Sequence, residues 1–568
     1  MLRQLRLHAL PVMLALVVPF GVRSAVLSVC PLKGATDEPN RRTQLLAESP
    51  MQNWALNLHD GAQQPGETAC ASLQLPVDAS AVQWSTLLAS DDPLLTAHTL
   101  TLQGTARGAA FDVSEVFTSG DEPPEPADSS SAPSTGPVPA WQAFGREERA
   151  RVQSDGRLVC AAGQAPAGFF ARLPPASSPG GQPVLQVVAR GRGQFQIGMS
   201  DPDRLARESP LALGTLSANK DWRVHELTPL APQAEWTAVS IACPNVEAEL
   251  EVRSLALHAG RQQRAAWMWS PALWQSSPDQ IWTWVTAHRL NTVMITVPVQ
   301  QERVANADVL QRFLIEATRR NVAVWAVAGD PRDVLPSSHV ALRARLAAYR
   351  DYNQTAAASA RLAGVQLDIE PYLLPGYRLN PRAWRDAYLG TVQAAREELG
   401  AAIPLDMVVP VWWGTDRHWG PGWLDALVSS GVSLTVMNYR TNEAALIKGA
   451  APFLDWGTRY RRPVTMALEL GPIPDETRRA FARGQGQGEL WALALGQHTA
   501  LILFNRPVEG LKGSAWQYRN SRNFSGTHVT FERKPAQLQQ SVEHLLPTWA
   551  AWEGFRGIAI HGLDVTPK

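Results

Sequence analysis

The stretch GVQLDIEPY, residues 364–372, decides how the C-terminal half of the chain is interpreted. An apolar run is followed at once by two acids, Asp368 and Glu370, with Ile369 between them. Side chains at 366, 368 and 370 share one face of a strand, because successive residues point to opposite faces. Acids at the end of a buried strand cost free energy unless they are paired or functional. The stretch therefore predicts a buried parallel strand that ends at a polar site.

Seven further strand-like runs lie between residue 264 and the end of the sequence, with amphipathic helical stretches between most of them. This alternation indicates a parallel α/β fold, and eight strands in about 300 residues favour a (β/α)8 barrel over an open sheet. We therefore expect a barrel domain over residues 264–568. The predicted strands cover residues 265–270, 292–297, 322–327, 364–370, 404–411, 433–439, 464–470 and 557–563.

Residues 471–556 are too many for a single crossover between the last two predicted strands. The pattern predicts a helix over 475–497, a strand over 500–504, and an Arg/Asn/aromatic segment over 506–525. A strand over 528–531 and a helix over 536–552 complete the interval. We interpret its middle as an inserted hairpin or lid over the barrel mouth.

The first half of the chain is predicted to be all-β. Residues 30–120 contain short alternating runs of half-buried strands, and residues 121–139 form a Pro/Ser/acid-rich linker. Seven or more strand-like runs within 140–260 favour a β-sandwich or jelly roll, which resembles a carbohydrate-binding module or is a plain structural sandwich. The 30–120 module is expected either to stand alone or to share sheets with this sandwich.

The N-terminus and the cysteines predict export. Residues 1–25 resemble a secretory signal, with Arg3 and Arg6 before an apolar run that is too short for a bilayer span. A membrane anchor, or a lipoprotein signal ending at Cys30, is the alternative. We expect a periplasmic or secreted protein with no stable membrane span. The expected disulfides are Cys160–Cys243 and Cys30–Cys70.

Composition excludes several classes of function. Lys+Arg and Asp+Glu both total 52, so the formal net charge of zero argues against a nucleic-acid-binding protein. The sequence contains no GxSxG elbow, no P-loop, no dinucleotide fingerprint after a strand and no His-x-x-x-His pair. We therefore predict neither a cofactor nor a metal.

The strand that carries Glu370 resembles the signature of family 18 glycoside hydrolases, which include chitinases, related endoglycosidases and chitinase-like lectins. That signature is Asp-x-x-Asp-x-Asp-x-Glu. The resemblance implies that Glu370 is the general acid and that Asp368 orients and stabilises the N-acetyl group of the substrate. The two earlier Asp positions of the signature are Ala363 and Gln366 here.

Two further strands carry the resemblance over about 300 residues. Residues 436–440, VMNYR, are similar to the family's Met-x-Tyr, so that Tyr439 takes the place of the Tyr that supports the N-acetyl group. The last strand resembles the family's final strand, with His561 where an aromatic residue is expected. The implied activity is hydrolysis of a polysaccharide or oligosaccharide with retention, in which the substrate's own acetamido oxygen is the nucleophile.

Glu469, a lone acid near the end of the seventh strand, keeps other mechanisms open. It is a candidate second carboxylate, either as the nucleophile of a retaining enzyme or as the base of an inverting one. A non-catalytic glycan-binding barrel, like the chitinase-like lectins, is the alternative function.

Aromatic residues follow several predicted strand ends. The chain has 21 Trp, and an aromatic ring presents an apolar face to a sugar ring. We expect the adjacent pair Trp412 and Trp413 to contact the ligand. The remaining candidates for substrate binding are Tyr372, Arg440, Trp267, Trp269, His561 and Asp416.

Overall fold

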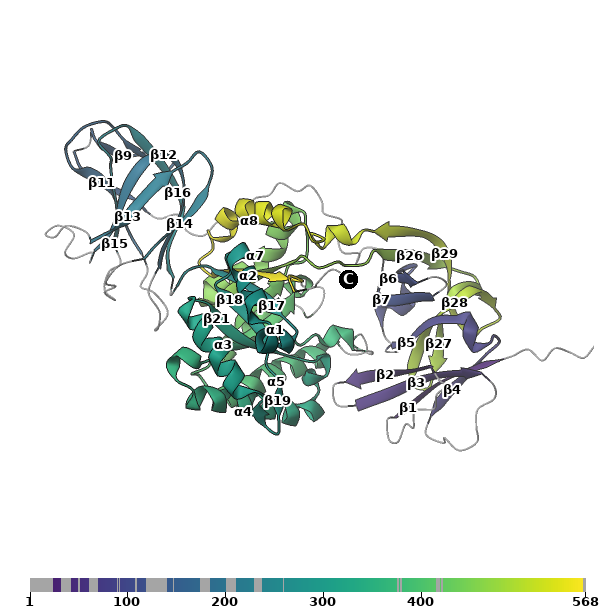
Figure 1. The fold of residues 1–568 in the computed structure, drawn as a ribbon. Helices are drawn as coiled ribbons and strands as arrows, with labels where there is room; N and C mark the ends of the chain where they lie inside the picture. The colour runs from purple at the N-terminus through teal and green to yellow at the C-terminus, as the bar shows by residue number, and fades with distance from the viewer. Residues whose placement is uncertain are drawn as a thin grey trace, which may run out of the picture.

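The chain forms a barrel flanked by two β-rich parts (Figure 1). The computed structural model describes residues 24–31, 42–49, 52–60, 70–88, 90, 92–107, 110–118, 140–146, 148–173, 184–200, 211–228, 238–258, 260–374, 377, 381–414, 419 and 422–564. The predicted signal as far as residue 23 and the predicted linker, 121–139, lie outside these residues. Within them, no helix has the length and apolar character needed to cross a bilayer.

Eight parallel strands close into a barrel, which confirms the predicted fold class. Each predicted strand is found, because its apolar run is buried on both faces, inside the barrel and beneath the helices. In barrel order the strands are β17 Gln263–Met268, β18 Thr292–Thr296, β21 Ala323–Ala328, β22 Gly364–Leu367, β23 Leu405–Pro410, β24 Ser433–Met437, β25 Val464–Glu469 and β30 Phe555–His561.

Amphipathic helices cover the outside of the barrel. In α3, Leu310, Phe313, Leu314 and Ala317 are buried at the spacing of one helix face. A two-stranded ribbon of β19 Val299–Gln300 and β20 Arg303–Val304 precedes this helix. The helices are α1 Pro271–Ser276, α2 Pro278–His288, α3 Ala307–Arg319, α4 His339–Thr355, α5 Pro381–Leu399, α6 Trp423–Ala426, α7 Glu443–Tyr460 and α8 Pro535–Trp549.

Residues 140–258 form an antiparallel sandwich on the left of Figure 1. The long strand β12 contains Gly191 and Gly193, both at positive φ. A Cβ at Gly191 would lie 2.1 Å from the Glu249 carbonyl oxygen, so only glycine fits there. The strands are β8 Gln142–Gly145, β9 Ala150–Val152, β10 Leu158–Cys160, β11 Ala167–Arg172, β12 Val184–Ser200, β13 Leu211–Ala218, β14 Arg223–Leu227, β15 Ala238–Ala242 and β16 Ala248–His258.

A disulfide closes this sandwich. Cys160 and Cys243 are bonded, as predicted. Cys70 is also disulfide-bonded, whereas the side chain of its predicted partner, Cys30, lies outside the described set, so that pairing stays a prediction.

The N-terminal strands and the barrel insertion form one domain, on the right of Figure 1. A seven-stranded sheet has the order β5-β28-β27-β29-β26-β6-β7, so the four strands of the insertion lie side by side in its centre and N-terminal strands flank them on both edges. A four-stranded sheet of order β2-β3-β1-β4 packs against it. The strands are β1 Ala25–Pro31, β2 Arg42–Ser49, β3 Gln52–Asp60, β4 Ala71–Leu75, β5 Val82–Leu88, β6 Thr99–Arg107, β7 Ala110–Thr118, β26 Glu476–Arg483, β27 Gln487–Leu495, β28 His498–Glu509 and β29 Gly513–Phe524.

This domain corrects two expectations. The helix predicted over 475–497 is wrong, because β26 and β27 occupy that range. In β27, Leu490 and Ala492 face one apolar core while Trp491 and Leu493 face another, so an unbroken apolar run is a strand buried on both faces. The 30–120 module neither stands alone nor shares sheets with the 140–260 sandwich, since its strands pair with the insertion.

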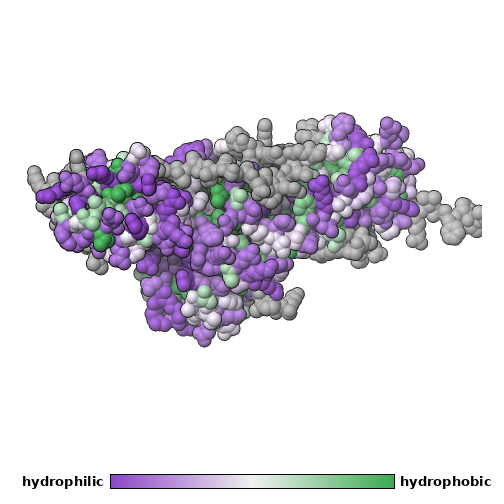
Figure 2. All heavy atoms as spheres, turned by 90° about the horizontal axis from the view of Figure 1, so that it is seen from above, coloured by the Kyte–Doolittle hydropathy of each residue, from purple (hydrophilic) through white to green (hydrophobic). Residues whose placement is uncertain are grey.

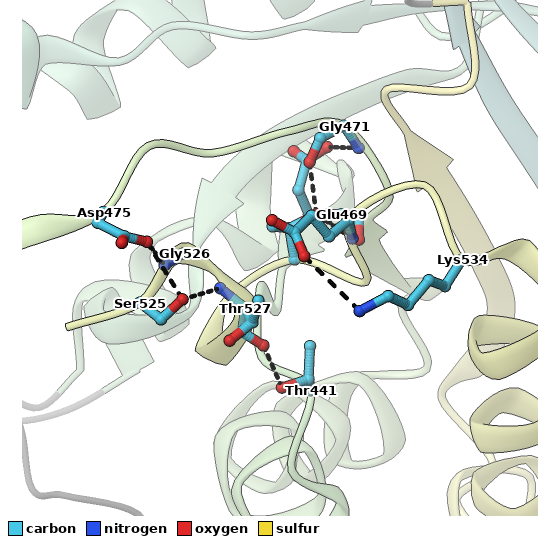
Figure 3. A network of polar contacts seen from close by, with 10 residues as sticks. Thr441, Glu469, Gly471, Asp475, Ser525, Gly526, Thr527 and Lys534 are labelled. Atoms are coloured by element: carbon cyan, nitrogen blue, oxygen red, sulfur yellow. Dashed lines mark hydrogen bonds and ion pairs between the residues drawn. The ribbon is translucent and has the colours of Figure 1, made fainter.

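The two connections between barrel and insertion form a neck, shown in Figure 3. The outgoing connection follows Glu469, and the returning one donates the Phe531 amide to the Glu469 carbonyl at 2.9 Å. Asp475 Oδ1 accepts from Ser525 Oγ at 3.1 Å and from the Gly526 amide at 2.9 Å. Thr441, after β24, donates its hydroxyl to the Thr527 carbonyl at 2.8 Å. These bonds fix the returning connection to the barrel end.

We predict that Gly526→Ala destabilises the chain by about 1–3 kcal/mol, because overpacking forces the backbone apart. The added Cβ would lie 2.0 Å from the Ile473 carbonyl oxygen of the outgoing connection. Chemical denaturation followed by tryptophan fluorescence measures the change. Gly390→Ala in α5 is the control, because its Cβ meets no atom within 4 Å. Equal effects of the two substitutions would contradict a tightly closed neck.

Candidate active site

Asp368 and Glu370 lie where β22 ends, at the carboxyl end of the barrel. The Asp368 amide donates to the Ala328 carbonyl at 2.8 Å, which continues the pairing with β21. Asp368 Oδ1 is buried and accepts no hydrogen bond from the described residues. Burial, with the neighbouring Glu370 charge, raises the pKa of Asp368 to about 7, against the opposing effect of His561. Asp368 is thus a desolvated carboxyl group without a full set of partners.

Glu370 is half-buried and receives a hydrogen bond from the hydroxyl of Tyr372. Burial raises its pKa, while the Tyr372 hydrogen bond and His561 act in the opposite direction. The titrations of Asp368 and Glu370 are therefore linked, and together the pair retains a proton at a higher pH than ordinary carboxyl groups. A partly exposed carboxyl group that stays protonated is suited to act as a general acid.

Below this pair, Gln366 joins a buried polar network inside the barrel. Trp267 Nε1 donates to Gln366 Oε1 at 2.6 Å, and Gln366 Nε2 donates to Asp406 Oδ2 at 2.8 Å. The hydroxyls of Ser433 and Thr435 also donate to Asp406, each at 2.7 Å. Burial raises the pKa of Asp406, and these three hydrogen bonds oppose that rise. The neutral amide of Gln366 is thus hydrogen-bonded to an acid, Asp406, on the adjacent strand β23.

Asp406 was not among the site residues predicted from the sequence. Its signal was a single acid within the otherwise apolar run 404–411. Tyr388 on α5 was also missed, because nothing in the sequence distinguishes it from a core residue. Its buried hydroxyl lacks a hydrogen-bond partner among the described residues. Burial and the charges of Asp368 and Asp406 raise its pKa well above the usual value.

Glu469 supports His561. Trp269 Nε1 donates to His561 Nε2 at 3.0 Å, and His561 Nδ1 lies 2.6 Å from Glu469 Oε2. An indole N–H only donates, so this geometry fits the neutral ring with its proton on Nδ1. Burial lowers the pKa of His561, but the hydrogen bond that His561 donates to Glu469 and the nearby negative charges raise it overall. Protonation at Nε2 would break the contact with Trp269.

The role predicted for Glu469 as second carboxylate is not what its geometry supports. Its Oε1 accepts from the Gly471 amide at 2.6 Å, Oε2 is held by His561, and the side chain is 4% exposed. Each oxygen therefore already accepts one hydrogen bond, in a side chain with little exposed surface. Glu469 positions His561 instead.

Tyr439 and Arg440 follow β24 at the same barrel end. The ring of Tyr439 lies against His561, with centroids 6.0 Å apart and planes at 28°. Burial raises the pKa of Tyr439, as do the charges of Glu469, Asp368 and Glu370, so its hydroxyl stays protonated. Arg440 donates to the Tyr439 carbonyl at 2.6 Å. Burial and the neighbouring Arg478 lower the pKa of Arg440, while Glu476 opposes them.

The predicted aromatic contacts divide into two groups. Trp413 is fully buried, with its ring stacked on Trp419 at 3.9 Å, and Trp267 is 1% exposed inside the barrel. The prediction that Trp413 and Trp267 contact the ligand is therefore wrong, because both rings belong to the core. Trp412 is half-buried and meets the edge of Tyr372 at 5.2 Å, beside Glu370. Trp269 is also only partly buried, whereas Asp416 lies outside the described residues.

Comparisons with known proteins show likeness of fold only. Neither a protein-family model nor a curated protein matches this sequence. Among solved structures, a chitinase from Rhizomucor miehei is 15% identical with a TM-score of 0.29, and covers 54% of this chain and 96% of its own. A chitinase from Chromobacterium violaceum is 13% identical with a TM-score of 0.30 and the same coverage.

A xylanase 10B fragment from Clostridium thermocellum, with CBM22-1 and GH10 modules, is 11% identical with a TM-score of 0.25. It covers 59% of this chain and 79% of its own. Likenesses with TM-scores this low carry no argument about function.

We predict that Trp413→Ala lowers the free energy of unfolding by about 3–5 kcal/mol, because a large buried ring is lost. Trp412→Ala is the matched control, with a smaller expected loss of about 1–2 kcal/mol for a half-buried ring. Denaturant titration of both variants measures the contrast. A Trp413 variant as stable as the native chain would show that this ring is not part of the core.

Proposed function

We propose that this protein is a glycoside hydrolase in which Glu370 is the general acid. The observation that carries the proposal is the pair Asp368 and Glu370 at the carboxyl end of a barrel strand, where active sites of this fold lie. Burial raises the pKa of both groups, so the pair holds a proton that Glu370 delivers in this proposal.

The proposed reaction retains configuration through the substrate's own acetamido group. Glu370 gives its proton to the oxygen of the glycosidic bond as that bond breaks. The acetamido carbonyl oxygen of the same sugar attacks the anomeric carbon, while Asp368 accepts a hydrogen bond from the acetamido N–H. Glu370, now a carboxylate, takes a proton from the water that opens the cyclic intermediate. In this proposal Tyr439 donates its hydroxyl to the acetamido oxygen.

The hydrogen bonds of Glu469 favour the substrate-assisted mechanism over one that uses Glu469 as a second carboxylate. Both of its oxygens are engaged, by Gly471 and by His561. The unpartnered Oδ1 of Asp368 supports a role in which that oxygen meets the substrate. The proposed substrate is therefore a polysaccharide or oligosaccharide that contains N-acetylhexosamine.

We further propose that the protein is exported to the periplasm or beyond. The bond between Cys160 and Cys243 supports this, as does the bonded state of Cys70. Disulfides persist mainly in oxidising compartments.

Glu370→Gln is expected to lower kcat by about 10²–10⁴-fold, because the amide cannot supply the proton. Hydrolysis of chitin oligosaccharides, with oligosaccharides that lack acetamido groups in parallel, measures the loss and the substrate class. Glu397→Gln is the control, because Glu397 is exposed on α5 and pairs only with surface partners.

Three outcomes separate the alternatives. Unchanged turnover by the Glu370 variant would remove Glu370 from the acid role. Binding of acetamido sugars without turnover in the native chain would instead establish a glycan-binding barrel. Cleavage of oligosaccharides without acetamido groups at the same rate would contradict substrate assistance.

Tyr372→Phe is expected to move the basic limb of the pH profile of kcat/KM to higher pH. The Tyr372 hydroxyl lowers the pKa of Glu370, so its removal keeps the acid protonated further into the basic range. Rates measured from pH 4 to pH 9 test this. Tyr352→Phe is the control, because the Tyr352 hydroxyl donates to the Ala360 carbonyl on the barrel exterior. This variant is expected to leave the basic limb of the pH profile unchanged. A shift to lower pH would contradict the assignment of Glu370 as the acid.

A further inference from the structure

The 140–258 sandwich docks on helix α8 of the barrel. The side chains of Gln186 and Ser254 both donate to the Ala550 carbonyl, at 2.9 and 3.2 Å. Val188 is buried within the main barrel core, and β14 lies beside α8. Apolar and polar contacts thus fix the two domains at this junction, which is also visible at the upper left of Figure 1.

A groove of about 460 Å³ opens at this junction. This volume lies within the range of small-molecule sites. Its sandwich side carries four cations and one acid, Asp221, and α8, which contributes the acid Glu543, forms the opposite side. The four cations, Arg190, Lys220, Arg223 and Arg253, outnumber the two acids. Seen from above in Figure 2, the described surface of the molecule is mainly hydrophilic. The groove therefore suits a polar ligand.

Two guanidinium groups in this groove make cation–π contacts with the same indole ring. The Cζ atoms of Arg253 and Arg190 lie 4.0 and 4.7 Å from the centroid of Trp222. Trp222 is half-buried and packs against the barrel core, so the ring holds both cations at the junction.

The two cations differ in their partners. Arg190 Nε pairs with Glu251 at 2.7 Å. Arg253 is half-buried, and its guanidinium forms no ion pair or hydrogen bond with the part of the chain that the structure describes. Burial lowers the pKa of Arg253, and so does the nearby Arg190, while Glu251 opposes this. The groove thus holds two neighbouring positive charges, Arg190 and Arg253, and the guanidinium of Arg253 has N–H donors available for a ligand.

We propose that this groove binds an oxyanion-bearing sugar residue, such as a uronate, at a site separate from the barrel mouth. A planar carboxylate accepts two parallel N–H donors from a guanidinium, which is the arrangement that Arg253 leaves unfilled. Lys220 and Arg223 add charge at the groove edge. A saccharide fits the volume and the polar lining, and the ligand would bridge the sandwich and the barrel. The proposal does not depend on hydrolysis by the barrel.

Isothermal titration calorimetry of the full chain tests the site, with trigalacturonate as the probe. The Glu370→Gln background is used so that turnover adds no heat. Cellotriose is the neutral arm, and sodium sulfate and sodium phosphate are the free-oxyanion arms. We expect trigalacturonate to bind and cellotriose not to bind, with affinity that falls as the salt concentration rises.

Arg253→Gln is expected to weaken trigalacturonate binding by at least about tenfold, because a charge-assisted pair is lost. Arg312→Gln is the matched control, since Arg312 is exposed on α3 and, among the described residues, forms its ion pair with Asp308. Circular dichroism checks folding. If the Arg253 variant fails to fold, Lys220→Gln, on an exposed turn, takes its place with an expected loss of at least about twofold.

The proposal is overturned by several results. These are no binding of trigalacturonate, equal binding of cellotriose, binding of sulfate or phosphate alone, or equal affinity in the folded Arg253 variant and the Arg312 control. Because the readout is binding, inactivity of the barrel leaves this test unaffected.

Discussion

Desolvation of carboxyl groups at the carboxyl end of a closed barrel is the constraint on which the site depends. Two acids, Asp368 and Glu469, lie at that end, and Asp406 lies lower inside the barrel, near the start of β23. Asp406 and Glu469 are buried and Asp368 is half-buried, and the fold treats each differently. Asp406 receives three hydrogen bonds from side chains, and Glu469 is held by an amide and by His561. Asp368 keeps an oxygen without a partner. Because an unsatisfied buried acid costs free energy, this contrast separates structural acids from the one suited to a ligand.

The same barrel end anchors the insertion. The connection that leaves β25 and the one that returns toward α8 bond to each other and to the barrel, so the neck begins directly after Glu469. The sheet beyond the neck is completed by strands from the first 118 residues. The N-terminal region therefore reaches its native partners only when residues far along the chain are in place, which makes these contacts strongly non-local.

The sequence predicted the barrel strands well and the insertion poorly, for a physical reason. A barrel strand is an apolar run between helices, and its local pattern specifies it. The run in β27 is equally apolar, but its two faces meet different cores, each of which is built partly from the N-terminal strands. Local periodicity does not depend on such distant partners. It therefore predicts a helix for this run, although the run is a strand buried on both faces.

By itself, the sequence determined the barrel, the sandwich and the candidate acids, because strand period and residue chemistry are local properties. Only the tertiary structure decided which residues are accessible. It placed Trp413 in the core, tied Glu469 to His561, and matched Gln366 with Asp406 across two strands. It also brought Arg253 onto Trp222 at a domain junction. The burial of a side chain and its hydrogen-bond partners depend on residues distant in the chain, and a single sequence does not show which residues these are.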